Sequence, residues 1–367
     1  MSAAIVVGIM TLCLGVLFFW AFRVLPGEPW QILAVWPRQK EPDGTWRGTN
    51  LTYYGLFNGL GLAVAVAVTV FLLGTMRMPL PYVAWCVFVL LAVTVPASKI
   101  VNRMVEGHWH GFTIGGASFV GMVAGPWLVW GISRLTLSAE EGAMATVSVM
   151  GAIACAYALG EGIGRLACIS FGCCYGRPLA DCPAWLSKLF THGAFVFEGR
   201  LKKSSYEHRY EGKRLIPVQA LTAIISSMAG LVGMAVFLGG HPVLAYVMPV
   251  VATQVWRFVS EFLRADYRGA GRITAYQGMA LAGAAYTVAL GLLWSGTLAL
   301  TPDVARGLAL LWTPGAILLI EAVALFVAIR MGLSTVTTAR IHFGLRQDGV
   351  PPVSPALRTS DGSLTQD

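Results

Sequence analysis

The chain has 367 residues, of which 56% are hydrophobic and only 12% are charged, and its mean hydropathy is +0.68. An ordinary soluble domain carries about twice that share of charged residues, so the composition excludes a soluble enzyme and a nucleic-acid-binding module. The composition instead indicates an integral membrane protein. Its formal net charge of +8 is unevenly distributed along the chain.

Nine apolar stretches are long enough to cross about 30 Å of hydrocarbon. They cover residues 4–24, 54–75, 80–97, 113–133, 143–164, 217–238, 243–263, 275–297 and 309–330. The first ends in Phe18, Phe19, Trp20 and Arg23 without a small-residue cleavage site, so we expect a retained anchor. Because lipid offers the backbone no hydrogen-bond partners, we predict an all-α polytopic membrane protein with about nine transmembrane helices.

The segments between these stretches are mostly short. Residues 26–50 form a polar connector, and residues 176–216 are the only sizeable extramembrane loop, here named the head loop. Within the head loop, residues 194–197 and 204–206 predict a small hairpin around a glycine. Residues 349–367 have the composition of a disordered tail.

The basic residues predict a topology. If successive loops alternate between the two membrane sides, 21 Lys and Arg residues share the side of the head loop and three lie on the other. By the positive-inside rule the richer side is cytoplasmic, with the N-terminus outside and the C-terminus in the cytoplasm. Eight of the 21 belong to the head loop itself, where a substrate is an alternative reason for them.

Two spans carry charged residues at helical spacing. Glu161 and Arg165 are four residues apart, and Arg257, Glu261 and Arg264 share one stripe. Charges at bilayer depth are costly and usually face a protein interior or a wet cavity. The planar guanidinium suits phosphate oxygens, so arginines from two helices are a candidate pocket for a lipid phosphate. The alternative is that each Glu–Arg pair satisfies itself and only locks helices together.

Glycines and histidines add weaker signals. Gly172 and Gly176 permit tight turns and close backbone approach to a ligand, although glycine is also common where membrane helices pack. Residues 115–121 open a span and either present backbone N–H groups to an anion or pack helices. His108 and His110 are either interfacial residues or members of the site.

Seven cysteines are present, of which Cys13, Cys86 and Cys155 lie in spans and are expected to pack. The other four, Cys168, Cys173, Cys174 and Cys182, cluster around the turn before the head loop. Their spacing differs from the paired pattern that zinc sites favour, and we predict no metal. Structural thiols are the favoured interpretation, with a disulfide or a reactive or metal-binding set as alternatives.

The segment Gly164-Arg165 … Gly172-Cys-Cys-Tyr-Gly-Arg-Pro178 resembles the signature of the prolipoprotein diacylglyceryl transferase family, especially a Gly-Cys-Cys-Tyr-Gly-Arg-Pro variant. The resemblance extends from about residue 53 to about residue 296. Further positions match family motifs: Tyr54 in an early Trp-Tyr-Gly, Lys99 in place of the arginine of Gly-Ala-Arg, Ser118 in Ser-Phe-His-Gly, Gln219 in His-Pro-x-Gln, Arg257 and Glu261 in Arg-Phe-x-x-Glu, and Gln277.

The resemblance implies a bacterial inner-membrane enzyme that moves the diacylglyceryl group of phosphatidylglycerol to the thiol of a lipobox cysteine in a preprolipoprotein, without a cofactor. It implies a seven-helix core at residues 53–297 with the head loop. An extra anchor and connector at 1–52 and an extra helix at 298–348 would flank this core. Three residues are implied as catalytic: Arg165 and Arg257 holding the phosphate, and Glu261 orienting Arg257. Those implied in substrate binding are Tyr54, Lys99, Glu161, Gly172, Gly176, Arg177, Gln219 and Arg264.

Several positions depart from the family pattern. The family's proposed catalytic histidine is Val120 here, the signature asparagine and glutamate are Cys168 and Cys173, and Ile216 and Thr253 replace a histidine and a tyrosine. The family's polar loop also lies outside the cytoplasm, whereas the basic residues predict the cytoplasmic side. Two alternatives therefore stay open: the same phospholipid chemistry with another acceptor, possibly cytoplasmic, and a non-catalytic lipid-binding relative.

Overall fold

The computed structural model describes residues 2–107, 113–137, 139–266, 273–294, 301–333 and 342–344. Within these ranges nine helices are long and apolar enough to cross a membrane, which confirms the predicted all-α polytopic class. They are α1 (Ala3–Val24), α2 (Tyr53–Thr75), α3 (Leu80–Glu106), α4 (Ile114–Thr136), α5 (Ala139–Phe171), α8 (Val218–Leu238), α9 (Pro242–Ser260), α10 (Ala275–Leu293) and α12 (Pro314–Gly332). His108, His110 and the predicted disordered tail lie outside the described residues.

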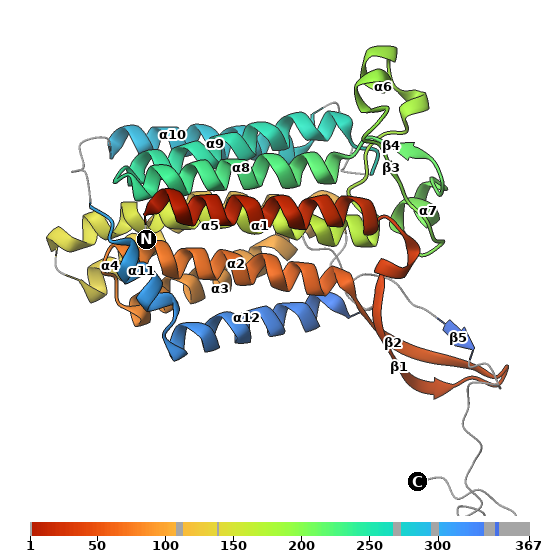
Figure 1. Ribbon diagram of the computed structural model, residues 1–367, viewed down its shortest axis with the longest axis horizontal. Coiled ribbons are helices and arrows are strands. Elements are labelled where there is room, and N and C mark those ends of the chain that lie inside the picture. The colour runs from red at the N-terminus through yellow and green to blue at the C-terminus, as the bar shows by residue number, and fades with distance from the viewer. Residues whose placement is uncertain are drawn as a thin grey trace, which may run out of the picture.

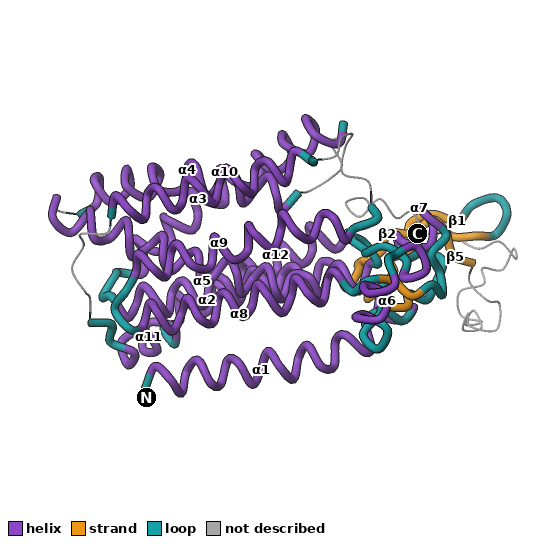
Figure 2. Tube along the Cα trace, turned by 90° about the horizontal axis from the view of Figure 1, so that it is seen from above, coloured by secondary structure: helices purple, strands orange, loops and turns teal. Residues whose placement is uncertain are grey.

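Helix α5 forms the centre of the bundle, between α2, α8 and α9 (Figures 1 and 2). Its small residues allow this position. A Cβ added at Gly160 would lie 2.9 Å from the carbonyl oxygen of Gly61 on α2, and one at Gly162 would lie 2.9 Å from that of Ala223 on α8. Small residues let membrane helices approach closely, so the two glycines bring neighbouring backbones against the helix that carries Glu161 and Arg165.

Helices α1 and α12 lie at the periphery. Figure 2 shows α1 along one side of the bundle, where it contacts α8. Helix α12 packs directly on the backbone of α2, since a Cβ at Gly55 would come within 2.1 Å of the carbonyl oxygen of Ala328. The hydroxyl of Thr52 also donates to the carbonyl of Gly332, at 3.0 Å. Helices α1 and α12, which the sequence predicted as extra spans at the two ends of the chain, therefore lie on the outside of the bundle and in close contact with it.

The polar connector is a β-hairpin, which the sequence did not predict. Strand β1 (Ile32–Lys40) pairs antiparallel with β2 (Thr45–Thr52), and β5 (His342–Gly344) adds a third strand. The short helix α11 (Val304–Leu311) lies at the opposite end of the bundle, whereas the hairpin extends from the end that carries the head loop (Figure 1).

The head loop contains α6 (Ala184–Phe190), β3 (Phe195–Val196), α7 (Lys203–His208) and β4 (Arg214–Leu215). The predicted pairing of residues 194–197 with 204–206 is wrong, because β3 pairs with β4 and residues 204–206 are helical. Gly199, with φ of +102°, turns the chain, and an ion pair four residues apart, Lys203 with Glu207 at 3.8 Å, supports α7.

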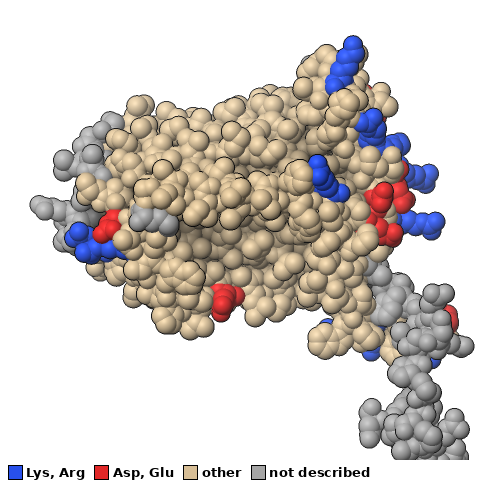
Figure 3. Space-filling model, viewed as in Figure 1, with Lys and Arg blue, Asp and Glu red and all other residues tan. Residues whose placement is uncertain are grey.

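Charged side chains gather at the ends of the molecule, and the visible side surface between them is almost uncharged (Figure 3). The N-terminus lies at the end opposite the head loop (Figure 1). The helices alternate in direction as the loop assignment assumed, so the β-hairpin, the head loop and the residues that follow α9 share one end, here named the head end.

Candidate functional site

The two predicted Glu–Arg groups meet near the head end of the bundle. One carboxylate oxygen, Glu161 Oε1, accepts hydrogen bonds from Arg165 Nη2 at 2.5 Å and from Arg257 Nη2 at 2.6 Å. The first arginine is on α5 and the second on α9. All three side chains are at least nine-tenths buried. A single acidic group therefore joins two buried cations from two helices.

Arg257 has further partners on two other elements. Its Nη1 donates to the hydroxyl of Ser118 on α4, and its Nη2 to that of Tyr157 on α5, each at 2.8 Å. The sequence predicted that Glu261 orients Arg257; in the described structure Glu161 makes the ion pair with Arg257, and Glu261 makes one with Arg264. Helix α9 ends at Ser260 and the chain continues as a 3-10 turn, so Glu261 leaves the α-helical stripe of Arg257.

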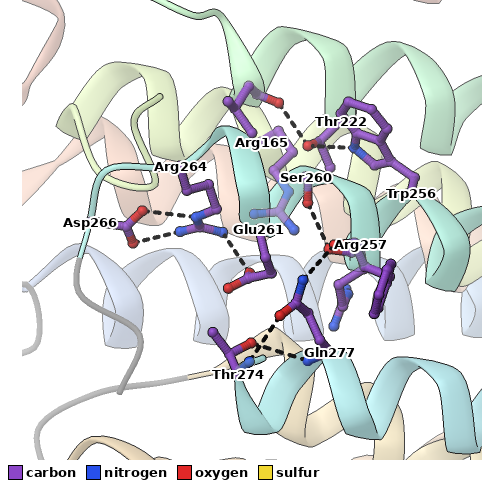
Figure 4. Close-up of polar contacts among 12 residues, drawn as sticks. Arg165, Thr222, Trp256, Arg257, Ser260, Glu261, Arg264, Asp266, Thr274 and Gln277 are labelled. Atoms are coloured by element: carbon purple, nitrogen blue, oxygen red, sulfur yellow. Dashed lines mark hydrogen bonds and ion pairs between the residues drawn. The ribbon is translucent and has the colours of Figure 1, made fainter. Parts of the chain in front are cut away.

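Glu261 instead lies beside Arg264, with 3.7 Å between Glu261 Oε1 and Arg264 Nη1. Arg264 also makes a two-pronged ion pair with Asp266, at 2.8 and 2.6 Å (Figure 4). An isolated β-bridge between Gly176 and Arg264 holds this segment against the turn that follows α5. Three arginines and three carboxylates thus lie at the head end of the α5–α9 contact.

A cavity of about 70 Å³ lies among these groups. Its size suits several waters or one small anion such as a phosphate group, and it is too small for a whole phospholipid. Two buried polar atoms of its lining, Arg165 Nε and Glu261 Oε2, have no hydrogen-bond partner among the described residues. The cavity is therefore bordered by an N–H donor that could bind an anion, Arg165 Nε, and by a carboxylate oxygen that could accept a proton, Glu261 Oε2.

Most of the predicted site residues line this cavity. Tyr54 on α2 contributes one wall and packs its ring against Phe171 at 5.5 Å between centroids. The predicted residues in the lining are Tyr54, Glu161, Arg165, Arg257, Glu261 and Arg264. Lys99 and Arg177 are not among them, because their side chains are exposed, on α3 and at the start of the head loop respectively.

The remaining predicted residues shape the turn after α5. Gly172 has φ of +72°, and a Cβ there would lie 2.9 Å from the Cβ of Lys202. A Cβ at Gly176 would lie 2.3 Å from the carbonyl oxygen of Ile216, so only glycine fits. The amide of Gln219 donates to the carbonyl of Cys173 at 2.9 Å. These three residues position the turn and do not line the cavity.

Sequence reasoning missed several lining residues. Thr222, Trp256 and Tyr276 come from α8, α9 and α10, and the indole of Trp256 donates to the hydroxyl of Thr222 at 2.9 Å (Figure 4). Tyr157 contacts Arg257 from outside that lining. Tyr157 precedes Glu161 by four residues, so the stripe of polar residues on α5 was the available signal.

Lys202 in the head loop is also buried, which its sequence context does not predict. Its ammonium group donates to the carbonyl of Leu25 at 3.0 Å and to that of Ser170 at 2.7 Å, which ties the end of α1 to the end of α5. Burial lowers the pKa of Lys202 to about 7, although Glu28 and Glu198 act in the opposite direction.

A larger cavity of about 400 Å³ lies in the head loop, between the 3-10 turn η2 (Leu179–Asp181), α6 and β4. It contains none of the predicted site residues, and its two basic residues, Lys213 and Arg214, are exposed. The buried and incompletely paired charges lie at the smaller cavity, which is therefore the candidate site.

The fold and the cavity define a polytopic membrane protein with a buried, arginine-lined cavity near the head end of the helix bundle. The chain belongs to the prolipoprotein diacylglyceryl transferase family, whose model matches residues 45–294. The match contains α2 to α10, the head loop and every lining residue, and it leaves α1, α11 and α12 outside. No curated protein matches the chain. Membership assigns it to membrane-bound transferases of lipoprotein biosynthesis in general terms.

Proposed function

We propose that the protein transfers the diacylglyceryl group of phosphatidylglycerol to the thiol of a lipobox cysteine in a preprolipoprotein, at the bacterial inner membrane. Family membership supports the class of reaction. The observation that carries the proposal to these residues is the pair of arginines beside a cavity of phosphate size, with Arg165 Nε buried and unpartnered among the described residues.

Arg165 and Arg257 bind the phosphate of the donor in this proposal. In the transfer, a carbon–sulfur bond forms at the glyceryl carbon and the carbon–oxygen bond to the phosphate breaks. The electron pair of the broken bond stays on the phosphate oxygen, so glycerol phosphate leaves as an anion. Preorganised guanidinium groups in a water-poor site stabilise the charge that collects there. Glu161 holds both guanidinium groups in place for this purpose.

Glu261 is the proposed proton acceptor for the thiol. Val120 occupies the position of the family's histidine and does not line the cavity. Glu261 does line it, and its buried Oε2 atom has no hydrogen-bond partner in the described part of the chain. The contact with Arg264 at 3.7 Å involves the other oxygen. The cavity therefore offers a carboxylate oxygen for the proton that a catalytic reaction must remove.

A second candidate is the same donor chemistry with a cytoplasmic acceptor. The cavity lies near the head end, which is the end richer in Lys and Arg, and the positive-inside rule favours a cytoplasmic location for such an end. In this case the C-terminus is cytoplasmic and the acceptor is a thiol or other nucleophile that has not been exported.

The test is the release of labelled glycerol phosphate from head-group-labelled phosphatidylglycerol by purified protein in the presence of a lipobox peptide. We expect Glu261→Gln and Arg165→Lys each to lower the rate by about 100-fold or more, since a lost proton acceptor or lost transition-state donor typically has that effect. Arg134→Lys, an exposed arginine at the opposite end of the bundle, is the matched control and keeps the wild-type rate. Binding without any release in the wild type would favour the non-catalytic relative.

A further inference from the structure

The turn after α5 brings together three thiols, one from the end of the helix and two from the turn itself. Cys168 is on the last turns of α5, and Cys173 and Cys174 follow it. All seven cysteines of the chain are described, and all are thiols rather than disulfides. The sulfur atoms of Cys168, Cys173 and Cys174 lie within 4.8 Å of one another. Cys182, the fourth cysteine near the turn, is not part of this group.

The backbone is bent so that the three sulfur atoms converge. Gly172 and Cys174 both have positive φ, +72° and +56°, and the amide of Cys173 donates to the carbonyl of Cys168 at 3.1 Å. A left-handed conformation is uncommon for a residue with a side chain and marks a position that the surrounding structure holds. Gln219 fixes the same turn from α8 through the carbonyl of Cys173.

This arrangement fits a thiophilic metal ion. A tetrahedral zinc site has Zn–S bonds of about 2.3 Å and therefore S···S separations of about 3.8 Å, which the observed cluster reaches by a small contraction. Zn²⁺ with three thiolates carries one net negative charge. The cations Arg165, Arg264 and Lys203 interact electrostatically with these thiols and would balance that charge. Spacing along the chain argued against zinc, but it does not show how the turn folds back.

Two of the three thiols, Cys168 and Cys174, also line the arginine cavity. Zinc with three protein ligands keeps a fourth position open in catalytic sites, where a water or a substrate binds. We propose that Cys168, Cys173 and Cys174 bind one Zn²⁺ ion whose open position faces the cavity and takes the acceptor thiol. The role of the open position rests on the proposed transferase function, whereas metal binding does not.

A bound zinc ion would help to deprotonate the acceptor thiol in the proposed transfer reaction. In model peptides a glutamic acid side chain titrates roughly four pH units below a cysteine thiol, so a carboxylate alone is a weak base for the acceptor. A thiol that coordinates a metal is deprotonated. On binding, the acceptor proton passes to Glu261 or to water. The zinc-held sulfur then forms the bond to the glyceryl carbon, the carbon–oxygen bond breaks, and the thioether product leaves the metal.

Metal binding is tested with the full-length protein in detergent, reduced with a phosphine and stripped with a chelator. Zn²⁺ is titrated in competition with a chromophoric chelator. We expect one Zn²⁺ per chain in the wild type. Each of Cys168→Ser, Cys173→Ser and Cys174→Ser should weaken binding by more than the 10- to 100-fold that loss of an outer partner causes. Cys182→Ser, a head cysteine whose thiol donates to the carbonyl of Pro178, should bind like the wild type.

The thermal midpoint of each metal-free variant is measured first, and only variants within about 2 °C of the metal-free wild type are compared, so that misfolding is not read as ligand loss. Cys173 and Cys174, which are both partly exposed, are better suited to this comparison than the buried Cys168. The metal site is refuted if the wild type binds no more Zn²⁺ than a variant with all three cysteines changed to serine. Equal loss in Cys182→Ser would refute it as well.

The open position is tested with Co²⁺ in place of Zn²⁺. A lipobox peptide containing cysteine should change the cobalt absorption bands, and the same peptide with serine should not. Cobalt binding without this change would refute the thiol-binding role. Both readouts are independent of turnover. Metal binding by an inactive protein would count against the proposed transferase function alone. Full activity of a metal-free protein would refute the role of the open zinc position in catalysis and leave the transferase function standing.

Discussion

The carboxylate of Glu161 is predicted to stabilise the bundle by neutralising two buried cations, and Glu161→Gln tests this. Both Nη2 atoms bond the same oxygen, at 2.5 and 2.6 Å, so they are at most 5.1 Å apart. Two unit charges about 5 Å apart repel by roughly 3 kcal/mol at an effective dielectric constant of about 20. Removal of one partner from a buried ion pair typically costs 3–5 kcal/mol, about the same magnitude.

The assay is thermal unfolding of purified protein in phosphate-free detergent. Glu161→Gln should lower the free energy of unfolding by about 3–5 kcal/mol and the midpoint by several degrees. Glu321→Gln on α12, a glutamate exposed in another span, is the matched control and should not destabilise the protein. Because an anion can replace the lost carboxylate, added phosphatidylglycerol should raise the midpoint of Glu161→Gln more than that of the wild type. A midpoint of Glu161→Gln within one degree of the wild type would refute the shared-carboxylate reasoning.

Three further predictions concern the clamp, the buried lysine and the membrane orientation. Arg257→Lys should lose at least about 100-fold in turnover while staying folded, since an ammonium group cannot reach Ser118 and Glu161 together as the guanidinium does; wild-type turnover would contradict the clamp. Burial lowers the pKa of Lys202 from 10.5 to about 7, so between these two pH values the unfolded chain binds a proton that the folded chain lacks. The free energy of unfolding should therefore rise with pH from about 7 to about 10.5, by at most about 1.4 kcal/mol per pH unit. Lys202→Met should remove this rise, and an identical pH profile in the variant would exclude Lys202 as its source. If the head loop is cytoplasmic, a cysteine introduced at the exposed Gly193 should not react with an impermeant thiol reagent in intact spheroplasts, whereas one introduced at Arg306 at the opposite end should react. The labelling of the parent protein, through its own cysteines, is subtracted as background. The reverse result would place the head loop outside the cytoplasm.

The spans were predictable because each is a nearly uninterrupted apolar run, which lipid can accommodate only as a helix. The β-hairpin of the connector was not predictable in the same way. Its first strand contains Pro37, its side chains are mostly exposed, and its register shifts beside that proline, so no clean alternation marks it. Strand pairing there depends on a distant segment, β5, that the local pattern does not show.

The candidate site was predictable in its residue types and less so in its connections. The stripe of Glu161 and Arg165 and the stripe of Arg257 each follow from helical spacing. The sharing of one carboxylate between them depends on how α5 packs against α9, which spacing along one helix cannot show. Lys99 was predicted to bind substrate because it stands at a family position, but it lies on an exposed face of α3. Its position along the chain could not show which way that face of the helix points.

The cluster of three thiols shows most clearly what spacing along the chain cannot predict. A separation of five residues between Cys168 and Cys173 does not resemble the usual ligand spacing of zinc proteins. The separation becomes suitable only because α5 ends at Phe171 and the turn through Gly172 reverses the chain onto the helix. A change of backbone direction of this kind depends on contacts with α8 and the head loop, which are distant in sequence.

The most direct test of the central claim is a transfer reaction with purified protein, acyl-labelled phosphatidylglycerol and a synthetic lipobox peptide. The product is analysed by mass spectrometry and the released glycerol phosphate is quantified in parallel. We predict a diacylglyceryl thioether on the peptide cysteine, one glycerol phosphate per thioether, and loss of both products in Arg165→Lys. Glycerol phosphate release without peptide modification would contradict the lipobox acceptor and favour another nucleophile. Absence of both products from a folded protein that binds the lipid would contradict the transferase assignment itself.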